Sequence, residues 1–147
     1  MKKISVILMM VLVLVGCGAK SSPQEDDGKL KVVSTFTIIT DMVEEIGQDK
    51  VSVTNLVPTG TDPHEYEPKP DDIQAITDAD LLLYNGLNLE GGEQGWFAKA
   101  TKSVKVDESK IHQLSDNITP MYLLGGGDDD EINPHAFISP KNGYVMH

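Results

Sequence analysis

The sequence contains no arginine and only one cysteine among its 147 residues. Its twelve cationic side chains are all lysines, and 23 acidic residues bring the formal net charge to −11. An acidic surface without guanidinium groups argues against nucleic acid as a partner, because phosphates need cationic contacts. A single cysteine excludes an internal disulfide framework. The acidity is compatible with cation binding, although in most proteins it serves only solubility.

The motifs of common hydrolases are missing as well. The chain has no His-Glu-x-x-His motif, no Gly-x-Ser-x-Gly motif and no cysteine after position 17. We therefore expect a protein that is not an enzyme. A zinc hydrolase remains an alternative, because two histidines and an acid can hold a catalytic zinc.

The N-terminus has the pattern of a lipoprotein leader. An apolar stretch from Ile4 to Val15 follows two lysines and is shorter than the ~20 residues that a membrane-spanning helix needs. The next residues lead to Cys17 and resemble the lipobox of bacterial lipoproteins, in which the peptide is cut before a cysteine that carries diacylglycerol. We expect residues 1–16 to be a signal peptide and Cys17 to be lipidated. The polar segment 17–28 then reads as a flexible tether to membrane lipid.

Strands and helices alternate through the rest of the chain, which we expect to form one unit over residues 29–147. Apolar and β-branched runs predict strands over 30–35, 51–57, 80–84 and 111–114. Helical spacing predicts helices over 38–46, ending at a glycine, from 70 to 76, and from 95 onward. This alternation predicts an α/β fold with a parallel sheet flanked by helices. Ligands of such sheets bind beyond the carboxyl ends of the strands.

Two histidines occur in the same local pattern, Asx-Pro-His. His64 follows Asp62 and Pro63 in a proline-rich loop after the second predicted strand, and His135 follows Asn133 and Pro134. Each proline restricts the backbone just before the histidine. A restricted ligand loses little entropy on binding, and a neutral imidazole suits a transition metal. A lone loop histidine is usually a solvated surface residue, and this interpretation is the better one for either histidine alone. The occurrence of two such turns in one chain indicates a metal site.

Other candidates receive simpler interpretations. His112 lies in a predicted strand, and His147 ends the chain. The acidic run 128–131 lacks the ligand spacing of a calcium loop. Glu65 and Glu67 fit positions at the entrance of a metal site better than ligand positions. We interpret Trp96 and Phe97 as core, and Asn85-Gly86 as a turn near the metal-binding face.

From Leu30 to Tyr144 the sequence resembles the metal-binding lipoproteins of manganese, zinc and iron ABC importers in Gram-positive bacteria. The stretches that carry the resemblance are 31–35, 57–66, 78–80, 84–90, 95–97 and 134–136. The manganese-type members are the most similar. Zinc-type members often carry a long histidine-rich acidic loop, which is missing here, and this favours manganese over zinc.

The resemblance implies a two-lobed receptor with a metal buried between (β/α) lobes that one long helix joins. It implies that His64 and His135 are the ligands from the N-terminal lobe and that a pair of acids from the C-terminal lobe completes the site. The bound metal would be Mn²⁺, with Zn²⁺ and Fe²⁺ as alternatives. The partner would be the membrane permease of the importer, and the location the outer face of the cell membrane.

A complete member of this family would be roughly twice as long, on the reasoning that each lobe is one unit. We therefore expect this chain to correspond to the N-terminal lobe only, from a truncated gene, a split gene or a partial sequence. Such a lone lobe leaves a further alternative open, a surface lipoprotein that acts as an adhesin or is a non-functional relic.

Overall fold

The computed structural model describes residues 28–123 and 131–146. The predicted signal peptide, Cys17 and the tether up to residue 27 lie outside the described residues, as do residues 124–130 of the acidic loop and His147. Within the described ranges, no helix has the length and apolar character needed to cross a membrane.

Four parallel strands form a single sheet in the order β2-β1-β3-β4. The strands are β1 (Leu30–Ser34), β2 (Val51–Asn55), β3 (Leu81–Tyr84) and β4 (Ile111–Gln113). The helices are α2 (Thr37–Gly47), α3 (Pro70–Asp78), α4 (Trp96–Ser103) and α5 (Pro140–Val145), with short 3₁₀ turns η1 (Gln48–Lys50), η2 (Gly92–Gln94), η3 (Glu108–Lys110) and η4 (Ala136–Ile138). The predicted α/β fold with a parallel sheet is confirmed, and the predicted strands and helices agree with the observed ones to within two residues.

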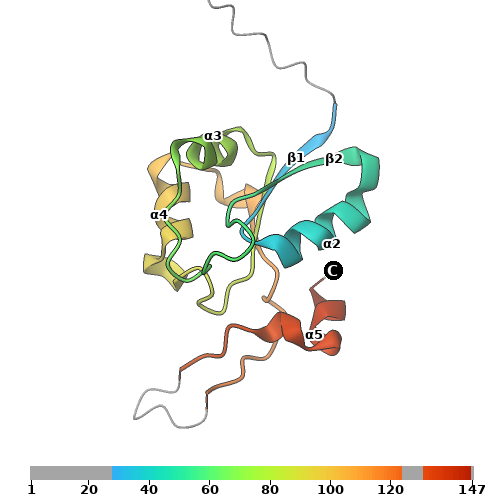
Figure 1. The fold of residues 1–147 in the computed structure, drawn as a ribbon, viewed down its shortest axis with the longest axis vertical. Helices are drawn as coiled ribbons and strands as arrows, with labels where there is room; N and C mark the ends of the chain where they lie inside the picture. Colours follow the sequence, from blue (N-terminus) through green and yellow to red (C-terminus); the bar gives the residue numbers. More distant parts are fainter. Residues whose placement is uncertain (1–27, 124–130, 147) are drawn as a thin grey trace, which may run out of the picture.

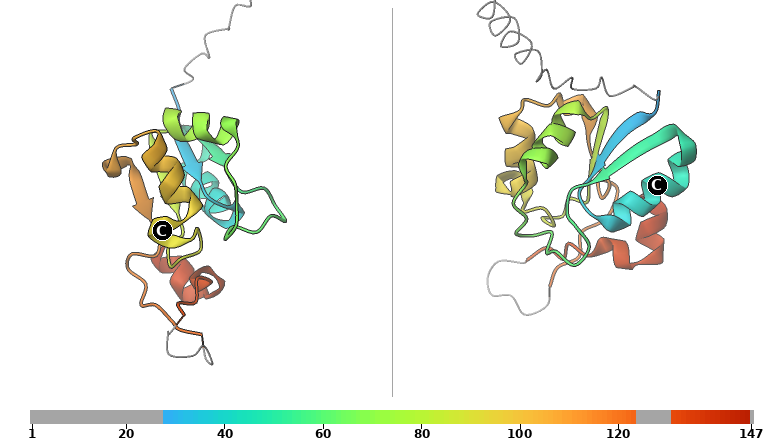
Figure 2. Two further views of the ribbon diagram at one scale, coloured as in Figure 1. Left: turned by 90° about the vertical axis from the view of Figure 1, so that its left-hand side faces the viewer. Right: turned by 45° about the horizontal axis from the view of Figure 1, so that its top comes forward.

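Helices cover both faces of the sheet. Strand β2 pairs with one side of β1, and the chain then crosses over to place β3 on the other side of β1. Parallel crossovers are right-handed, so this reversal sends the connecting helices to opposite faces. Helix α2 packs beside β1 and β2, while α3 and α4 lie together on the other face (Figure 1 and Figure 2). The reversal makes the carboxyl ends of β1 and β3 the expected ligand position.

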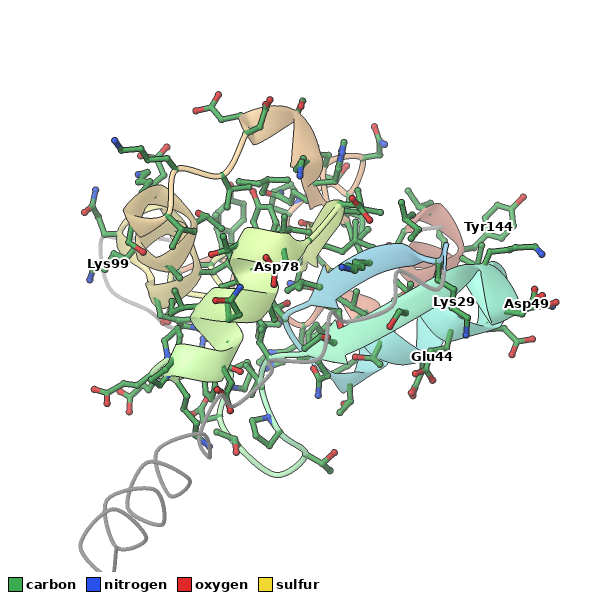
Figure 3. The ribbon with its side chains drawn as sticks, turned by 90° about the horizontal axis from the view of Figure 1, so that it is seen from above. Lys29, Glu44, Asp49, Asp78, Lys99 and Tyr144 are labelled. Carbon is green, nitrogen blue, oxygen red and sulfur yellow. The ribbon has the colours of Figure 1, made fainter. Side chains whose placement is uncertain are left out.

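The core lies between the sheet and these helices. Ile39 from α2, Ile76 from α3 and Leu82 from β3 are completely buried. The acids of the α2 side point outward, as Figure 3 shows for Glu44 and Asp49. Helix α2 ends at the predicted glycine, Gly47, where a Cβ atom would come within 2.4 Å of the Val51 side chain. The absence of a side chain at Gly47 therefore lets the end of α2 lie close to the start of β2, with η1 between them.

The C-terminal part of the described chain lies beyond the carboxyl edge of the sheet. After β4 the chain leaves the sheet, and Tyr122 and Ile132 form an antiparallel bridge. η4 and α5 follow, and both lie at the end of the molecule toward which the strands run (Figure 1). Ile118, Ala136 and Met146 form a small separate apolar cluster there. This arrangement brings the second Asx-Pro-His segment to the same edge as the loop after β2.

Candidate metal centre

His64 lies on the loop that connects β2 to α3, and the loop is fastened on both sides of it. Asp62 Oδ1 accepts a hydrogen bond from the His64 backbone N–H at 2.8 Å. Two residues later, Tyr66 is buried in the core and its hydroxyl donates to Asp72 Oδ2 at 2.7 Å. The same carboxylate accepts from the Lys69 N–H and so caps the start of α3. Burial and the hydrogen bond to Asp72 raise the pKa of Tyr66 to about 12.

His135 lies in a turn with the same hydrogen bond between the Asx side chain and the histidine backbone. Asn133 Oδ1 accepts from the His135 backbone N–H at 3.0 Å and lies 3.1 Å from the ring nitrogen Nδ1. An amide oxygen can only accept, so this contact is a hydrogen bond in the tautomer that carries its proton on Nδ1. The lone pair is then on Nε2, which is free to bind a metal.

The two imidazoles lie side by side at the carboxyl edge of the sheet. Their ring centroids are 6.1 Å apart with an interplanar angle of 74°, and both side chains are exposed. With metal–nitrogen bonds of about 2.1 Å, two imidazoles on one tetrahedral metal have centroids about 5 Å apart. Small side-chain rotations therefore bring both rings to one metal ion.

The remaining candidates do not join this pair. No group of three or more His, Cys, Asp or Glu side chains that could hold a metal occurs in residues 28–123 and 131–146. His112 is exposed on β4, which is an edge strand. Glu65 and Glu67 are exposed beside the first histidine. Among the described residues, the two imidazoles thus lie together without a third His, Cys, Asp or Glu side chain grouped with them.

One segment makes hydrogen bonds to both histidine loops. The sequence predicted a turn at Asn85-Gly86 in this segment and a core residue at Trp96, but not these hydrogen bonds. This segment, residues 85–96, runs from the end of β3 to the first residue of α4. At its start, Asn85 Nδ2 donates to the Pro134 carbonyl at 3.1 Å. At its end, Trp96 Nε1 donates to the Pro63 carbonyl at 2.7 Å. Phe97 is buried as predicted, whereas Trp96 is half-buried and has this second role. The sequence shows only that this segment has an asparagine near one end and a tryptophan at the other. It does not reveal that their side chains donate hydrogen bonds to the carbonyls that precede His135 and His64.

Glu90 holds the 85–96 segment in place. Its side chain is only 3% exposed and accepts hydrogen bonds from Thr35 Oγ1 at 2.7 Å, the Asn85 N–H at 2.8 Å and the Gly86 N–H at 3.1 Å. Desolvation raises the pKa of Glu90 above its ordinary value, although the three hydrogen bonds oppose the shift. The carboxylate thus joins Thr35, the residue after β1, to Asn85 and Gly86, the residues after β3.

Several known proteins are similar to this chain in sequence and fold. Residues 32–147 match the family model described as "Zinc-uptake complex component A periplasmic". The chain is 40% identical over 149 residues to the metal ABC transporter substrate-binding lipoprotein SsaB of Streptococcus sanguinis, covering 99% of this chain and 48% of that protein. It is 40% identical over 148 residues to the iron ABC transporter substrate-binding lipoprotein MtsA of Streptococcus pyogenes, covering 98% and 48%. The chain therefore spans about half the length of these relatives.

A solved structure shows the same relation. The Mn-bound periplasmic metal binding protein of Candidatus Liberibacter asiaticus matches with a TM-score of 0.66 and 37% sequence identity, covering 80% of this chain and 42% of that one. The matched proteins are substrate-binding components of transporters rather than enzymes. These matches confirm the resemblance that the sequence motifs indicated. The chain belongs to the family of zinc-uptake component A proteins, which includes the metal-binding lipoproteins of ABC importers.

Proposed function

We propose that this chain binds a divalent transition metal through His64 and His135 and serves the delivery of that metal to the permease of an ABC importer. Manganese is the proposed cargo. Cys17 carries the lipid that holds the protein at the outer face of the membrane. The signal peptide 1–16, the tether 17–28 and the lobe 29–147 form parts of the same proposal.

The convergence of the two Asx-Pro-His turns is the observation that carries this proposal. The turns come from loops far apart in the sequence, yet their rings lie 6.1 Å apart at one edge of the sheet. Both histidines also have their backbone N–H tied to the preceding Asx side chain. Two surface histidines without a common function would need neither the same Asx hydrogen bond to the backbone N–H nor neighbouring positions at one edge of the sheet.

The choice of manganese rests on the relatives and on ligand chemistry. The lipoprotein PsaA of Streptococcus pneumoniae is named for manganese and the Liberibacter structure contains manganese, whereas MtsA is named for iron. Manganese prefers oxygen ligands, so its site needs carboxylates in addition to the two imidazoles. In the proposed receptor a pair of acids from the second lobe supplies them.

Metal titration of the purified protein with Zn²⁺ and Mn²⁺ tests the proposal. A small site cannot lose one ligand without opening to water, so His64→Ala and His135→Ala should each weaken zinc binding at least tenfold. His112→Ala is the matched control and should leave binding unchanged, because His112 is exposed on β4, at the opposite edge of the sheet from β2, whose loop carries His64. Equal weakening by all three substitutions, or no binding by the parent protein, would contradict the proposal.

A further inference from the structure

We propose that Trp96 and Asn85 are positioning residues for His64 and His135, so that one segment between β3 and α4 aligns both halves of the histidine pair. This inference rests on the proposed function, in that the histidines are taken as ligands. It assigns to residues 85–96 a role in metal binding without direct contact with the metal.

The peptide unit that precedes each histidine is hydrogen-bonded at both of its ends. For the Pro63–His64 peptide, the carbonyl oxygen accepts from Trp96 Nε1 and the N–H donates to Asp62 Oδ1, at 2.7 and 2.8 Å. A peptide unit is planar, so fixing both its oxygen and its N–H fixes its orientation. The Cα of His64, from which the imidazole extends, is therefore fixed as well.

The Pro134–His135 peptide is held in the same way. Its carbonyl oxygen accepts from Asn85 Nδ2 at 3.1 Å, and its N–H donates to Asn133 Oδ1 at 3.0 Å. Asn85 is completely buried, and its Nδ2 also donates to the Gly86 carbonyl at 2.8 Å. Both amide hydrogens are thus used, and a flipped amide would place an oxygen against two carbonyl oxygens.

The two outside donors belong to one rigid unit. Trp96 packs edge-on against Tyr66 and Phe97, with ring centroids 5.2 and 5.7 Å apart. Asn85 is held through its own N–H by the buried Glu90 carboxylate. The Asn85 Oδ1 atom is buried without a hydrogen-bond partner among the described residues.

Zinc affinities of single and double variants test the proposal. Trp96→Phe removes the indole N–H but keeps an aromatic ring, and Asn85→Leu removes the amide at similar volume. Each should weaken zinc binding roughly tenfold, the loss typical of a group that orients a metal ligand. The matched controls are Tyr84→Phe, which removes the hydroxyl that donates to Gln113 Oε1 in the same region, and Thr101→Val, which removes a donor to α4 carbonyls. Both controls should bind zinc as the parent does.

The double variants separate positioning from general damage. Trp96→Phe should lose its effect on residual zinc binding once His64 is replaced by alanine, but keep it when His135 is replaced. Asn85→Leu should show the reverse pattern. If each substitution lowers affinity by the same factor in both histidine backgrounds, the loss is structural and the proposal is wrong.

A second measurement is independent of metal binding. In the metal-free protein, NMR signals of the histidine ring protons should shift more for His64 than for His135 in Trp96→Phe, and more for His135 than for His64 in Asn85→Leu. The second ring should shift less, because the two rings lie 6.1 Å apart and each feels the ring current of the other. Equal shifts of both rings, or no shift of either, would overturn the positioning roles. A parent protein that binds no zinc would contradict the proposed function, while the ring signals would still decide this inference.

Discussion

The buried carboxylate of Glu90 provides the most quantitative prediction. Replacing it by leucine fills a similar volume without an acceptor, so the backbone N–H groups of Asn85 and Gly86 and the hydroxyl of Thr35 lose their partner. Each buried donor left without an acceptor costs about 1–3 kcal/mol. The Thr35 hydroxyl can rotate towards another acceptor, so the loss of stability comes mainly from the two backbone N–H groups of Asn85 and Gly86.

Two such groups cost about 2–6 kcal/mol, and removal of a desolvated carboxylate offsets part of this loss. We expect Glu90→Leu to lower the free energy of unfolding by about 3 kcal/mol at pH 7, which lowers Tm by about 10 °C in a domain of this size. Urea unfolding followed by circular dichroism measures the loss. Glu93→Leu is the control, because Glu93 is exposed and the same chemical change there should have little effect. A loss below about 1 kcal/mol would refute the reasoning, since it falls short of even one orphaned donor.

The pH dependence gives a second check on Glu90. Its pKa in the folded protein is raised above the ordinary value of 4.5. At pH values between 4.5 and the raised pKa of the folded state, the folded protein binds more protons than the unfolded protein. The free energy of unfolding therefore falls as pH rises through this range. The stability that Glu90 contributes is thus complete below about pH 4.5 and declines as pH rises through its folded pKa. Glu90→Leu should therefore cost more at pH 4 than at pH 8, and the opposite trend would refute the assigned direction.

Three further predictions follow from other parts of the chain. Calorimetry should show that this protein alone binds Mn²⁺ much more weakly than Zn²⁺ or Cu²⁺, because two neutral nitrogens suit the latter metals better; a tight, stoichiometric manganese site would contradict this. Cys17→Ala should leave a precursor that is neither cleaved nor labelled by radioactive fatty acid in cells, and normal processing would exclude the lipobox interpretation. Tyr66→Phe should cost about 1 kcal/mol of stability and remove a tyrosine that ionises only near pH 12 in a spectroscopic titration, because the ring stays buried while the bond to Asp72 is lost.

The interior of the fold could be predicted because its signals are local. Alternating apolar strands and amphipathic helices follow from the spacing of residues such as Ile39 and Ile76, and each spacing matches the geometry of one element. The helix end at Gly47 and the helix start at Pro70 also depend on single residues and their nearest neighbours. The rule that ligands bind at the carboxyl ends of parallel strands then directs attention to the loop of His64.

By itself, the sequence determined the α/β class, the alternation of elements and the repeated Asx-Pro-His pattern, because these depend on residues only a few positions apart. Only the tertiary structure decided that the two histidines meet, since their separation depends on strand order and on the path of the chain after β4. It also decided the hydrogen-bond partners of Asn85, Glu90 and Trp96, which lie on distant segments. The physical reason is that a hydrogen bond between distant segments is set by three-dimensional distance, which no periodicity in the chain encodes.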